Sequence, residues 1–262
     1  VDEVYRVVDD RNRLEVFNPI AACLLGSDAA SHPAAPLLLA RGGEQYAIEQ
    51  SVSPIREHSG DIVGAVVVFR DVTKERSLAQ ELAWQASHDP LTGLVNRHEF
   101  ERRLAILADT ARLGREHHTL LYVDLDQFKL VNDTCGHIAG DELLRQLAAM
   151  LVPKIRSVDT LARLGGDEFG VLLPDCNVIQ GEAIAEKLRQ EISEFRFVWE
   201  NKTFAVGASV GLVEIVEESG GLAALLSAAD TACYMAKERG RNRIVVHAPH
   251  DADVRRRHGV IE

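Results

Sequence analysis

The chain has 262 residues, of which 46% are hydrophobic, so it is long enough for two domains with apolar cores. A formal net charge of -11 argues against broad binding to nucleic acid or to an anionic membrane, because the surface as a whole would repel either. The four cysteines are scattered singly with no CxxC pair, which indicates neither a zinc site nor a disulfide framework and favours a reducing, cytoplasmic location. No stretch approaches the roughly twenty apolar residues of a membrane span, and residues 1–4 lack signal-peptide features, so no membrane contact is expected from this chain.

Residues 1–73 are predicted to form a first unit that ends in a β-meander. Residues 46–54 alternate between apolar and polar side chains, and residues 62–69 are a nearly continuous β-branched run after a turn, as expected for paired antiparallel strands. Upstream of them, residues 18–19 and 31–36 break the pattern, which predicts loops and short helices.

This first unit resembles the C-terminal half of a PAS sensor domain. The resemblance rests on residues 41–49 (RGGEQYAIE), residues 53–55 (SPI) and the closing strand that runs into residues 71–73 (DVT). The first strands of such a domain are missing from the pattern, so residues 1–73 are interpreted as a partial PAS-like sensor segment.

Residues 74–86 are polar and helix-favouring, with Leu78 and Leu82 one turn apart. Two interpretations stay open for this segment. One is a signalling helix between sensor and output that pairs with its copy in a dimer, and the other is a monomeric connecting helix.

In the second unit, residues 87–247, helices are predicted to alternate with strands, except at one hairpin. The predicted elements are a helix over 97–113, a strand over 118–128, a helix over 140–156, the hairpin over 160–173, a helix over 180–194, a strand over 204–214, a helix over 221–239 and a strand over 243–247. This order predicts an α/β (α+β) sandwich in which helices cover a mixed sheet.

Gly165 and Gly166 join the two strands of the predicted hairpin, because adjacent glycines supply the positive φ values that a tight turn needs. Asp167 and Glu168 follow directly, so two carboxylates are predicted at the hairpin tip. Taken alone, this composition is that of a solvated turn.

Asp124 and Asp126 alternate along an otherwise apolar strand, so both are expected to project from the same face. Two unpaired acids there are costly without a cation or protonation, unless the strand simply ends in solvent at Asp124. Neighbouring strands of the sheet are expected to bring Asp167 and Glu168 close to Asp124. A carboxylate cluster at a strand end beside a glycine turn suits Mg²⁺ bound together with substrate phosphates, which favours phosphoryl or nucleotidyl transfer.

Four motif blocks, in order and with matching spacing, give the second unit a resemblance to the GGDEF family of diguanylate cyclases. The blocks lie within residues 89–97 (DPLTGL and NR), 124–141 (DLDQFK to GD), 163–169 (RLGGDEF) and 229–242 (AD to GRN). One departure is Val95, where the family usually has proline. The resemblance implies a fold akin to the palm of polymerases and nucleotidyl cyclases. It also implies a dimer that condenses two GTP, one from each domain, into cyclic di-GMP with release of two pyrophosphates.

The resemblance further implies a metal and catalytic site. Asp124, the Leu125 carbonyl and Asp167 would hold Mg²⁺, with Mn²⁺ as the alternative ion. Glu168 would lie near the ribose 3′-hydroxyl as the general-base candidate. Electrostatic stabilisation of the attacked phosphate is what such a reaction needs most.

By the same resemblance, nine residues would bind the substrate: Phe128, Lys129, Asn132, His137, Asp141, Gly165, Gly166, Lys237 and Arg241. Asn132 and Asp141 would hydrogen-bond the guanine edge, and Lys237 and Arg241 would clamp the terminal phosphates. Phe128 and Lys129 would add main-chain and charge contacts to the phosphates. Gly165 and Gly166 would let the hairpin backbone lie against the nucleotide, and His137 would have only a secondary role.

Simpler interpretations of these residues stay open. Lys237 and Arg241, four apart near a helix end, are expected to share a face, and they could equally be a solvated basic helix end favoured by the helix dipole. Asp141 could be a helix N-cap, Asn132 a turn residue and His137 an ordinary loop histidine.

Arg156 and Asp159 form an RxxD pattern that ends six residues before Gly165. In the family, this pattern at this offset is the inhibitory site, where the arginine binds the product cyclic di-GMP. The alternative is an arginine at a helix end followed by an aspartate in a connecting turn.

The tail, residues 248–262, is charged and has no core pattern. It resembles the link between a GGDEF domain and a following EAL phosphodiesterase domain, which indicates a piece of a longer tandem protein. Two functional hypotheses follow. The chain is an active diguanylate cyclase under sensor control, or it is a catalytically silent module whose binding of GTP or cyclic di-GMP controls an adjacent domain.

Overall fold

The structure is a computed structural model that describes residues 6–9, 19–24, 36–114 and 116–247. The chain divides into two compact units, residues 1–83 and residues 84–262. The predicted tail over residues 248–262 and the N-terminal residues 1–4 lie outside the described residues.

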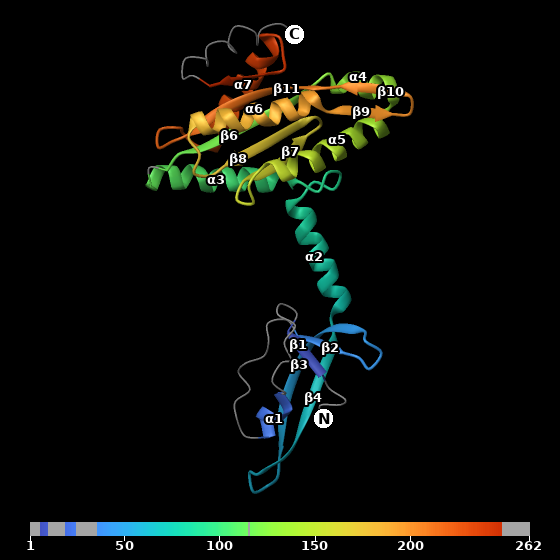
Figure 1. Ribbon diagram of the computed structural model, residues 1–262. Coiled ribbons are helices and arrows are strands. Elements are labelled where there is room, and N and C mark those ends of the chain that lie inside the picture. Colours follow the sequence, from blue (N-terminus) through green and yellow to red (C-terminus); the bar gives the residue numbers. More distant parts are fainter. Residues whose placement is uncertain (1–5, 10–18, 25–35, 115, 248–262) are drawn as a thin grey trace, which may run out of the picture. The chain divides into compact units, whose positions relative to one another are not determined.

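The first unit contains a four-stranded antiparallel sheet in the order β1-β2-β3-β4 (Figure 1). Its elements are β1 (Arg6–Asp9), α1 (Pro19–Leu24), β2 (Pro36–Leu39), β3 (Gln45–Arg56) and β4 (Ile62–Asp71). The predicted β-meander is the long β3–β4 hairpin, and its core is a buried cluster of Val8, Leu37, Ala47 and Val72. The short helix expected from the break at residues 18–19 is α1, but the strands β1 and β2, which also lie upstream of residue 46, were not predicted. These strands have four residues each, too few to show a period.

The helix predicted over residues 74–86 is α2 (Thr73–Ser87). Its start is fixed by Asp71, whose Oδ1 accepts hydrogen bonds from the Thr73 N–H at 2.9 Å and from the Thr73 hydroxyl at 2.6 Å. Leu78 and Leu82 are 49% and 66% exposed, and no residue of this helix is buried. The helix therefore contributes little to the core of the chain as described.

The second unit is built on a six-stranded sheet in the order β12-β11-β6-β8-β7-β5 (Figure 1). The strands are β5 (Val95–Asn96), β6 (His118–Asp126), β7 (Thr160–Gly165), β8 (Glu168–Leu173), β11 (Gly207–Ile215) and β12 (Arg243–Val246). The β11–β12 and β5–β7 pairs are parallel and the others antiparallel, so the predicted mixed sheet is confirmed. The central strand β6 is buried along its whole length.

Helices cover this sheet, as predicted, and they lie on both of its faces. One buried cluster joins the sheet to α3 (Arg97–Gly114) and α7 (Leu222–Glu238), and the other joins it to α5 (His137–Leu151) and α6 (Val178–Glu194). On β6, Leu120 and Tyr122 belong to the α3/α7 cluster. Leu121, Val123 and Leu125 belong to the α5/α6 cluster. The even-numbered residues of β6 therefore face α3 and α7.

The structure departs from the predicted boundaries around β6 and α5. The predicted strand over residues 118–128 ends at Asp126, because Gln127 adopts the left-handed conformation with φ 65° and an unpredicted helix, α4 (Phe128–Cys135), follows. The predicted helix over residues 140–156 begins earlier, at His137, and ends at Leu151. A 3₁₀ turn with Pro153 follows it, and proline cannot donate the next helical hydrogen bond.

The predicted strand over residues 204–214 is interrupted at Val206. The part before the break, β10 (Lys202–Ala205), pairs with the unpredicted strand β9 (Arg196–Trp199) in a separate two-stranded sheet. Only β11 joins the central sheet, where it pairs with β6 along nine residues.

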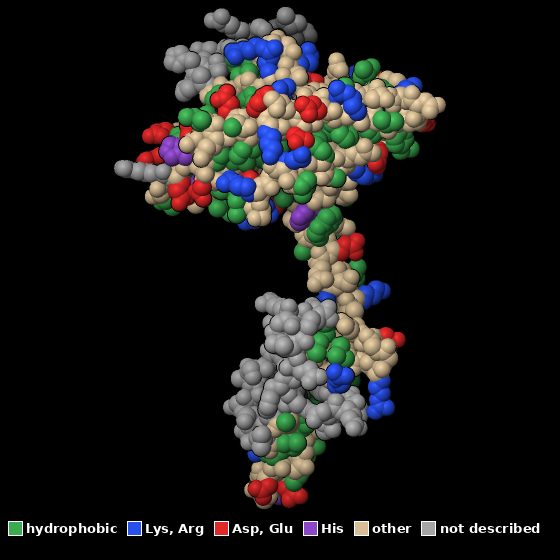
Figure 2. Space-filling view, viewed as in Figure 1, with side chains coloured by type: hydrophobic (Ala, Val, Ile, Leu, Met, Phe, Trp, Pro, Cys, Tyr) green, Lys and Arg blue, Asp and Glu red, His purple; other side chains and the backbone are tan. Residues whose placement is uncertain are grey.

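The surface of the second unit mixes both charge signs. On the face seen in Figure 2, Lys and Arg side chains lie among Asp and Glu side chains. No helix within the described ranges has the length and apolar character needed to cross a membrane. All four cysteines are free thiols.

His118 at the start of β6 is buried, with 1% of the residue exposed. Its Nδ1 accepts a hydrogen bond from the Asp175 N–H at 3.0 Å, so the ring proton lies on Nε2, 3.0 Å from the Thr110 hydroxyl. Burial lowers the pKa of His118 below its usual value. Protonation of this histidine would place a second proton where the Asp175 N–H donates.

We expect the stability of the second unit to fall as the pH is lowered below about 6.5, the usual pKa of histidine in an unfolded chain. Because the folded-state pKa of His118 is depressed, the unfolded state binds the proton first, and stability is complete only above that pH. Thermal unfolding of wild type and His118→Asn between about pH 7.5 and 5.5 tests this. The Tm of the variant should depend less on pH, whereas a variant of the exposed His98 should keep the wild-type dependence. Equal losses of Tm in all three proteins would contradict the assignment.

Candidate functional site

The predicted hairpin is confirmed by β7 and β8, which pair antiparallel on either side of the glycines. Gly165 has φ 147° and Gly166 has φ 50°, values that side chains other than hydrogen rarely allow. The register shifts between Arg163 and Gly165, so the tip departs from a regular ladder. Asp167 lies in this tip and Glu168 is the first residue of β8.

Sheet pairing brings three carboxylates together, as the sequence predicted. β6 and β8 are antiparallel neighbours, with Asp124 directly opposite Glu168. The Leu125 N–H donates to the Asp167 carbonyl at 3.2 Å, which holds the hairpin tip against β6. We call Asp124, Asp167 and Glu168 the acidic cluster.

Lys237 of α7 reaches the acidic cluster, because Asp124 is an even-numbered residue of β6 and faces α7. The Lys237 Nζ lies 2.6 Å from Asp124 Oδ2. Burial raises the pKa of Asp124, and the charges of Asp167 and Glu168 raise it further, although Lys237 opposes the change. Burial disfavours the charged lysine, but the hydrogen bond and charge of Asp124 and the further negative charge of Asp167 together outweigh it and raise the pKa of Lys237. The ammonium group therefore stays charged beside a carboxylate that lacks full solvation.

Asp126 projects to the same side as Asp124, as predicted, but its oxygens are already engaged by protein groups. Its Oδ1 accepts from the Ser209 hydroxyl at 2.8 Å, and its Oδ2 accepts from the Asn242 N–H at 2.9 Å. This carboxylate therefore anchors the loop after α7 to the end of β6.

Glu168 lies beside Arg97 and Tyr122, which were not among the predicted site residues. Arg97 Nη2 lies 3.3 Å from Glu168 Oε2, and Arg97 Nε donates to the Leu164 carbonyl at 2.7 Å. The Tyr122 phenol lies beside Glu168, and burial first and that carboxylate second raise the pKa of Tyr122. The position of Tyr122, two residues before Asp124 on the same strand face, was a signal available in the sequence.

The turn at residues 89–94 supports the hairpin tip. Arg163 Nη1 contacts both Asp89 carboxylate oxygens at 3.2 Å, and its Nε and Nη2 donate to the Gly166 carbonyl at 3.0 and 2.9 Å. Burial disfavours the charged Asp89, but hydrogen bonds from Thr92 and the Arg163 charge outweigh it and lower the pKa of Asp89. This carboxylate therefore stays ionised and keeps Arg163 on the hairpin.

The predicted guanine-binding residues lie where α4 and α5 meet. A methyl group on Gly140 would come 2.0 Å from Asn132 Oδ1 and 3.1 Å from the Phe128 ring, so the two helices touch here through the Asn132 amide. Within the described part of the chain, Asn132 Oδ1 is buried without a hydrogen-bond partner. Such an atom is costly unless a polar ligand meets it.

The simpler interpretations of Asn132 and Asp141 are wrong. Asn132 lies inside α4 and not in a turn, and Asp141 is the fifth residue of α5, so it is not the N-cap. His137 is exposed at the first position of α5, and not within a loop. All three side chains are therefore presented by helices.

Lys237 and Arg241 do not share a helix face, contrary to the prediction. α7 ends at Glu238, and Arg241 lies beyond its end with φ 59°. Among the contacts of the described residues, none joins Lys129, His137 or Arg241 to the acidic cluster. The structure therefore brings one of the two predicted phosphate clamps to the carboxylates.

Arg156 and Asp159 form a compact turn. The Asp159 carboxylate accepts from the Arg156 backbone N–H at 2.8 Å and from the Arg156 Nη2 at 2.7 Å, and Nη2 also donates to the Pro174 carbonyl at 3.0 Å. The side chain of Asp159 is 1% exposed and that of Arg156 is 50% exposed. The buried carboxylate thus orients an arginine that remains open to solvent on one side.

The donor set suits a metal ion that arrives with phosphates. Within the described residues, no group of three or more His, Cys, Asp or Glu side chains is arranged to hold a metal ion. Asp124, the Leu125 carbonyl and Asp167 supply three hard oxygen donors, and Mg²⁺ in nucleotide sites takes its remaining ligands from phosphates and water. These residues fit Mg²⁺ in that role.

Carboxylates at one strand end of a mixed sheet, beside a glycine hairpin and a facing lysine, are an arrangement that suits the binding of a phosphate ester together with a divalent metal ion. The sequence profile of the family described as "Diguanylate cyclase, GGDEF domain" matches residues 86–243. The chain belongs to this family. A second profile, described as "PAS fold", matches residues 8–77, so the PAS fold begins well upstream of the segment that resembled it in the sequence.

Two curated relatives match most of the chain. "Probable diguanylate cyclase DgcE" of Escherichia coli is 44% identical over 216 residues, which are 82% of this chain and 20% of that protein. "Cyclic di-GMP phosphodiesterase PdeB" of Shewanella oneidensis is 38% identical over 210 residues, 79% of this chain and 24% of that protein. The chain thus spans about a fifth to a quarter of the length of these relatives.

Among solved structures, the coiled coil and GGDEF domain of DgcB from Caulobacter crescentus, in complex with c-di-GMP, superposes with a TM-score of 0.62. It is 28% identical and covers 67% of this chain and 93% of its own. The fold of the second unit is therefore that of a GGDEF domain.

Proposed function

We propose that residues 87–247 form an active diguanylate cyclase, which condenses two GTP into cyclic di-GMP and releases pyrophosphate. The observation that carries this proposal is the acidic cluster with Lys237 2.6 Å from Asp124, on the strand ends of a GGDEF fold. The unpartnered Asn132 Oδ1 beside Gly140 supports a polar ligand at α4 and α5, where the guanine edge is proposed to bind.

In this proposal Glu168 accepts the proton of the attacking ribose 3′-hydroxyl. Arg97 contacts its carboxylate and Tyr122 lies beside it, so both residues help to orient the base. Asp124, the Leu125 carbonyl and Asp167 hold Mg²⁺ or Mn²⁺, which when bound neutralises phosphate charge and polarises the attacked α-phosphate.

The remaining substrate contacts follow the family positions. Lys237 and Arg241 neutralise the terminal phosphates, and Asn132 and Asp141 select guanine. The other proposed contacts come from the start of α4, the start of α5 and the hairpin glycines, namely Phe128, Lys129, His137, Gly165 and Gly166. Each domain holds one GTP, so the active species is a homodimer.

Each segment of the chain is proposed to have its own role. Residues 1–73 sense a signal, residues 74–86 transmit it and residues 87–247 produce the messenger. Residues 248–262 are proposed to be a linker. The proposed location is the cytoplasm, where the substrate GTP is available. An origin in a GGDEF-EAL tandem protein is part of the same proposal.

Incubation of the dimeric protein with GTP and Mg²⁺, followed by chromatography, tests the activity. Cyclic di-GMP and pyrophosphate should form in a ratio of one to two, and omission of the metal should stop the reaction. GTP binding without product would favour the second candidate, a silent regulatory module. The similarity to a protein named as a cyclic di-GMP phosphodiesterase keeps that candidate open.

Product inhibition is proposed to act through Arg156, which Asp159 orients toward solvent. Arg156→Ala should leave the initial rate unchanged and make turnover insensitive to added cyclic di-GMP, because the guanidinium that binds the phosphates is lost. Progress curves with increasing product measure this. Arg145→Ala, which removes another exposed arginine of the same unit, should remain inhibited. Unchanged inhibition of the Arg156 variant would remove the assignment.

A further inference from the structure

The loop that carries the second proposed phosphate clamp has an unfavourable backbone. Between α7 and β12, Gly240, Arg241 and Asn242 have φ values of 106°, 59° and 44°. Positive φ costs energy for residues other than glycine, so two successive ones persist only where contacts hold them. We call residues 239–242 the clamp loop.

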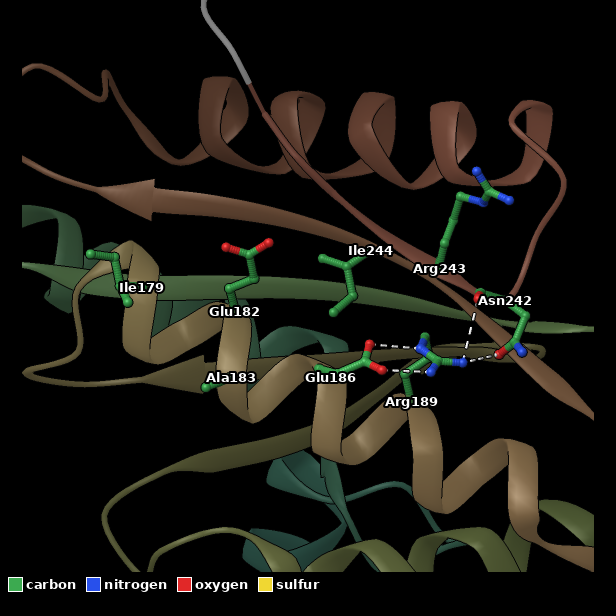
Figure 3. Close-up of a pocket in the computed structure, with 8 residues that line it drawn as sticks. All are labelled: Ile179, Glu182, Ala183, Glu186, Arg189, Asn242, Arg243 and Ile244. Atoms are coloured by element: carbon green, nitrogen blue, oxygen red, sulfur yellow. Dashed lines mark hydrogen bonds and ion pairs between the residues drawn. The ribbon is translucent and has the colours of Figure 1, made fainter.

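Two contacts from opposite sides hold Asn242. Its backbone N–H donates to Asp126 Oδ2 at 2.9 Å, at the end of β6. Its side-chain Oδ1 and its carbonyl accept from Arg189 Nη1 at 2.9 and 3.4 Å. Figure 3 shows Arg189 of α6 directed at both Asn242 and Glu186.

Arg189 is itself immobilised. Its Nε and Nη2 donate to the two oxygens of Glu186 at 2.8 and 2.6 Å, and its side chain is only 15% exposed. Two of the three guanidinium nitrogens, Nε and Nη2, are therefore held by Glu186 on the same helix, and the third, Nη1, donates to Asn242. A lysine could not contact Glu186 and Asn242 in this way, because its single ammonium group does not offer several donors in a fixed planar geometry.

The clamp loop begins at the C-terminal end of α7, which carries Lys237. The Gly240 N–H donates to the Lys237 carbonyl at 3.2 Å, and the Arg241 N–H donates to the Ala236 carbonyl at 3.0 Å. The position of the loop and the orientation of the last turn of α7 are thus linked. A group that fixes Asn242 also limits where Arg241 can lie.

We propose that Arg189 is a positioning residue for nucleotide binding, which acts through Asn242 to hold Arg241 where the terminal phosphates bind. This inference rests on the proposed function, because it assumes that the clamp loop meets a triphosphate. Arg189 lies on α6, on the opposite face of the sheet from α7, so it acts without contact to the acidic cluster.

Binding of 3′-deoxy-GTP and GMP to the full chain with Mg²⁺ tests the proposal, since neither ligand can be condensed. Arg189→Ala should weaken 3′-deoxy-GTP binding about tenfold and GMP binding less than about twofold, because only the former reaches the clamp loop. Arg189→Lys should give an intermediate loss and serves as the second variant if the alanine variant is unstable. In turnover, KM for GTP should rise while kcat is retained.

Glu191→Gln is the matched control, because it breaks another α6 ion pair, Lys154–Glu191 at 2.6 Å, away from the clamp loop. It should leave both affinities unchanged. Equal loss for both ligands in the arginine variants, or a wild type that binds both ligands alike, would overturn the proposal. If the wild-type chain makes no cyclic di-GMP but the Arg189 variants still lose affinity for 3′-deoxy-GTP selectively, the positioning role is supported while the proposed cyclase activity fails.

Discussion

Asp124→Asn is expected to abolish formation of cyclic di-GMP, with a loss of at least about a thousandfold in rate. Asp124 is 8% exposed, lies opposite Glu168 in the sheet and binds Lys237 at 2.6 Å. The substitution keeps the shape of the side chain but removes the charge proposed to bind the metal ion. It also leaves the Lys237 ammonium without its carboxylate.

Chromatographic product assays measure the effect, and the Tm shows whether the variant is folded. Asp109→Asn, which changes an exposed aspartate on α3, should keep the wild-type rate and is the matched control. Turnover of the Asp124 variant within about tenfold of wild type would mean that the catalytic site lies elsewhere.

Gly211→Ala is expected to lower the free energy of unfolding of the second unit by about 3 kcal/mol, and to displace α7. A methyl group at this position of β11 would lie 2.1 Å from the Ala229 carbonyl and 2.5 Å from the Cys233 nitrogen. Both atoms belong to the backbone of α7, so no side-chain rotation relieves the clash. The helix must move away from the sheet, and Lys237 moves with it.

Thermal unfolding should show a Tm lower by about 6–12 °C. Gly221→Ala is the control, since a methyl group there meets open space at the start of the same helix, and the change should stay within about 1 kcal/mol. A Gly211 variant as stable as wild type would show that α7 does not pack directly on β11.

Much of the fold was predictable because many of its helices and strands show a pattern within a few consecutive residues. The apolar spacing from Phe100 onward predicted α3, and Gly165-Gly166 predicted the hairpin, since both signals lie within a few residues. α4 was missed because its start depends on the left-handed conformation of Gln127, and a glutamine in the sequence does not indicate a positive φ. β1 and β2 were missed because four residues show no period.

The site was predictable only in part, for a related reason. Alternation along β6 and the hairpin placed the acidic cluster correctly. The contacts of Arg97 with Glu168, Arg189 with Asn242 and Asp126 with Asn242 join residues 71, 53 and 116 positions apart, respectively. Such contacts depend on the packing of whole elements and leave no local signal.

The ion pair between Lys237 and Asp124 has a consequence for the order of binding. Without nucleotide, Lys237 serves as an internal counterion for the carboxylate that is proposed to receive the metal ion. A metal ion arriving alone must displace that ammonium group, whereas one arriving with a triphosphate offers it new anionic oxygens. We therefore expect metal ion and nucleotide to bind with positive thermodynamic linkage, each raising the affinity for the other.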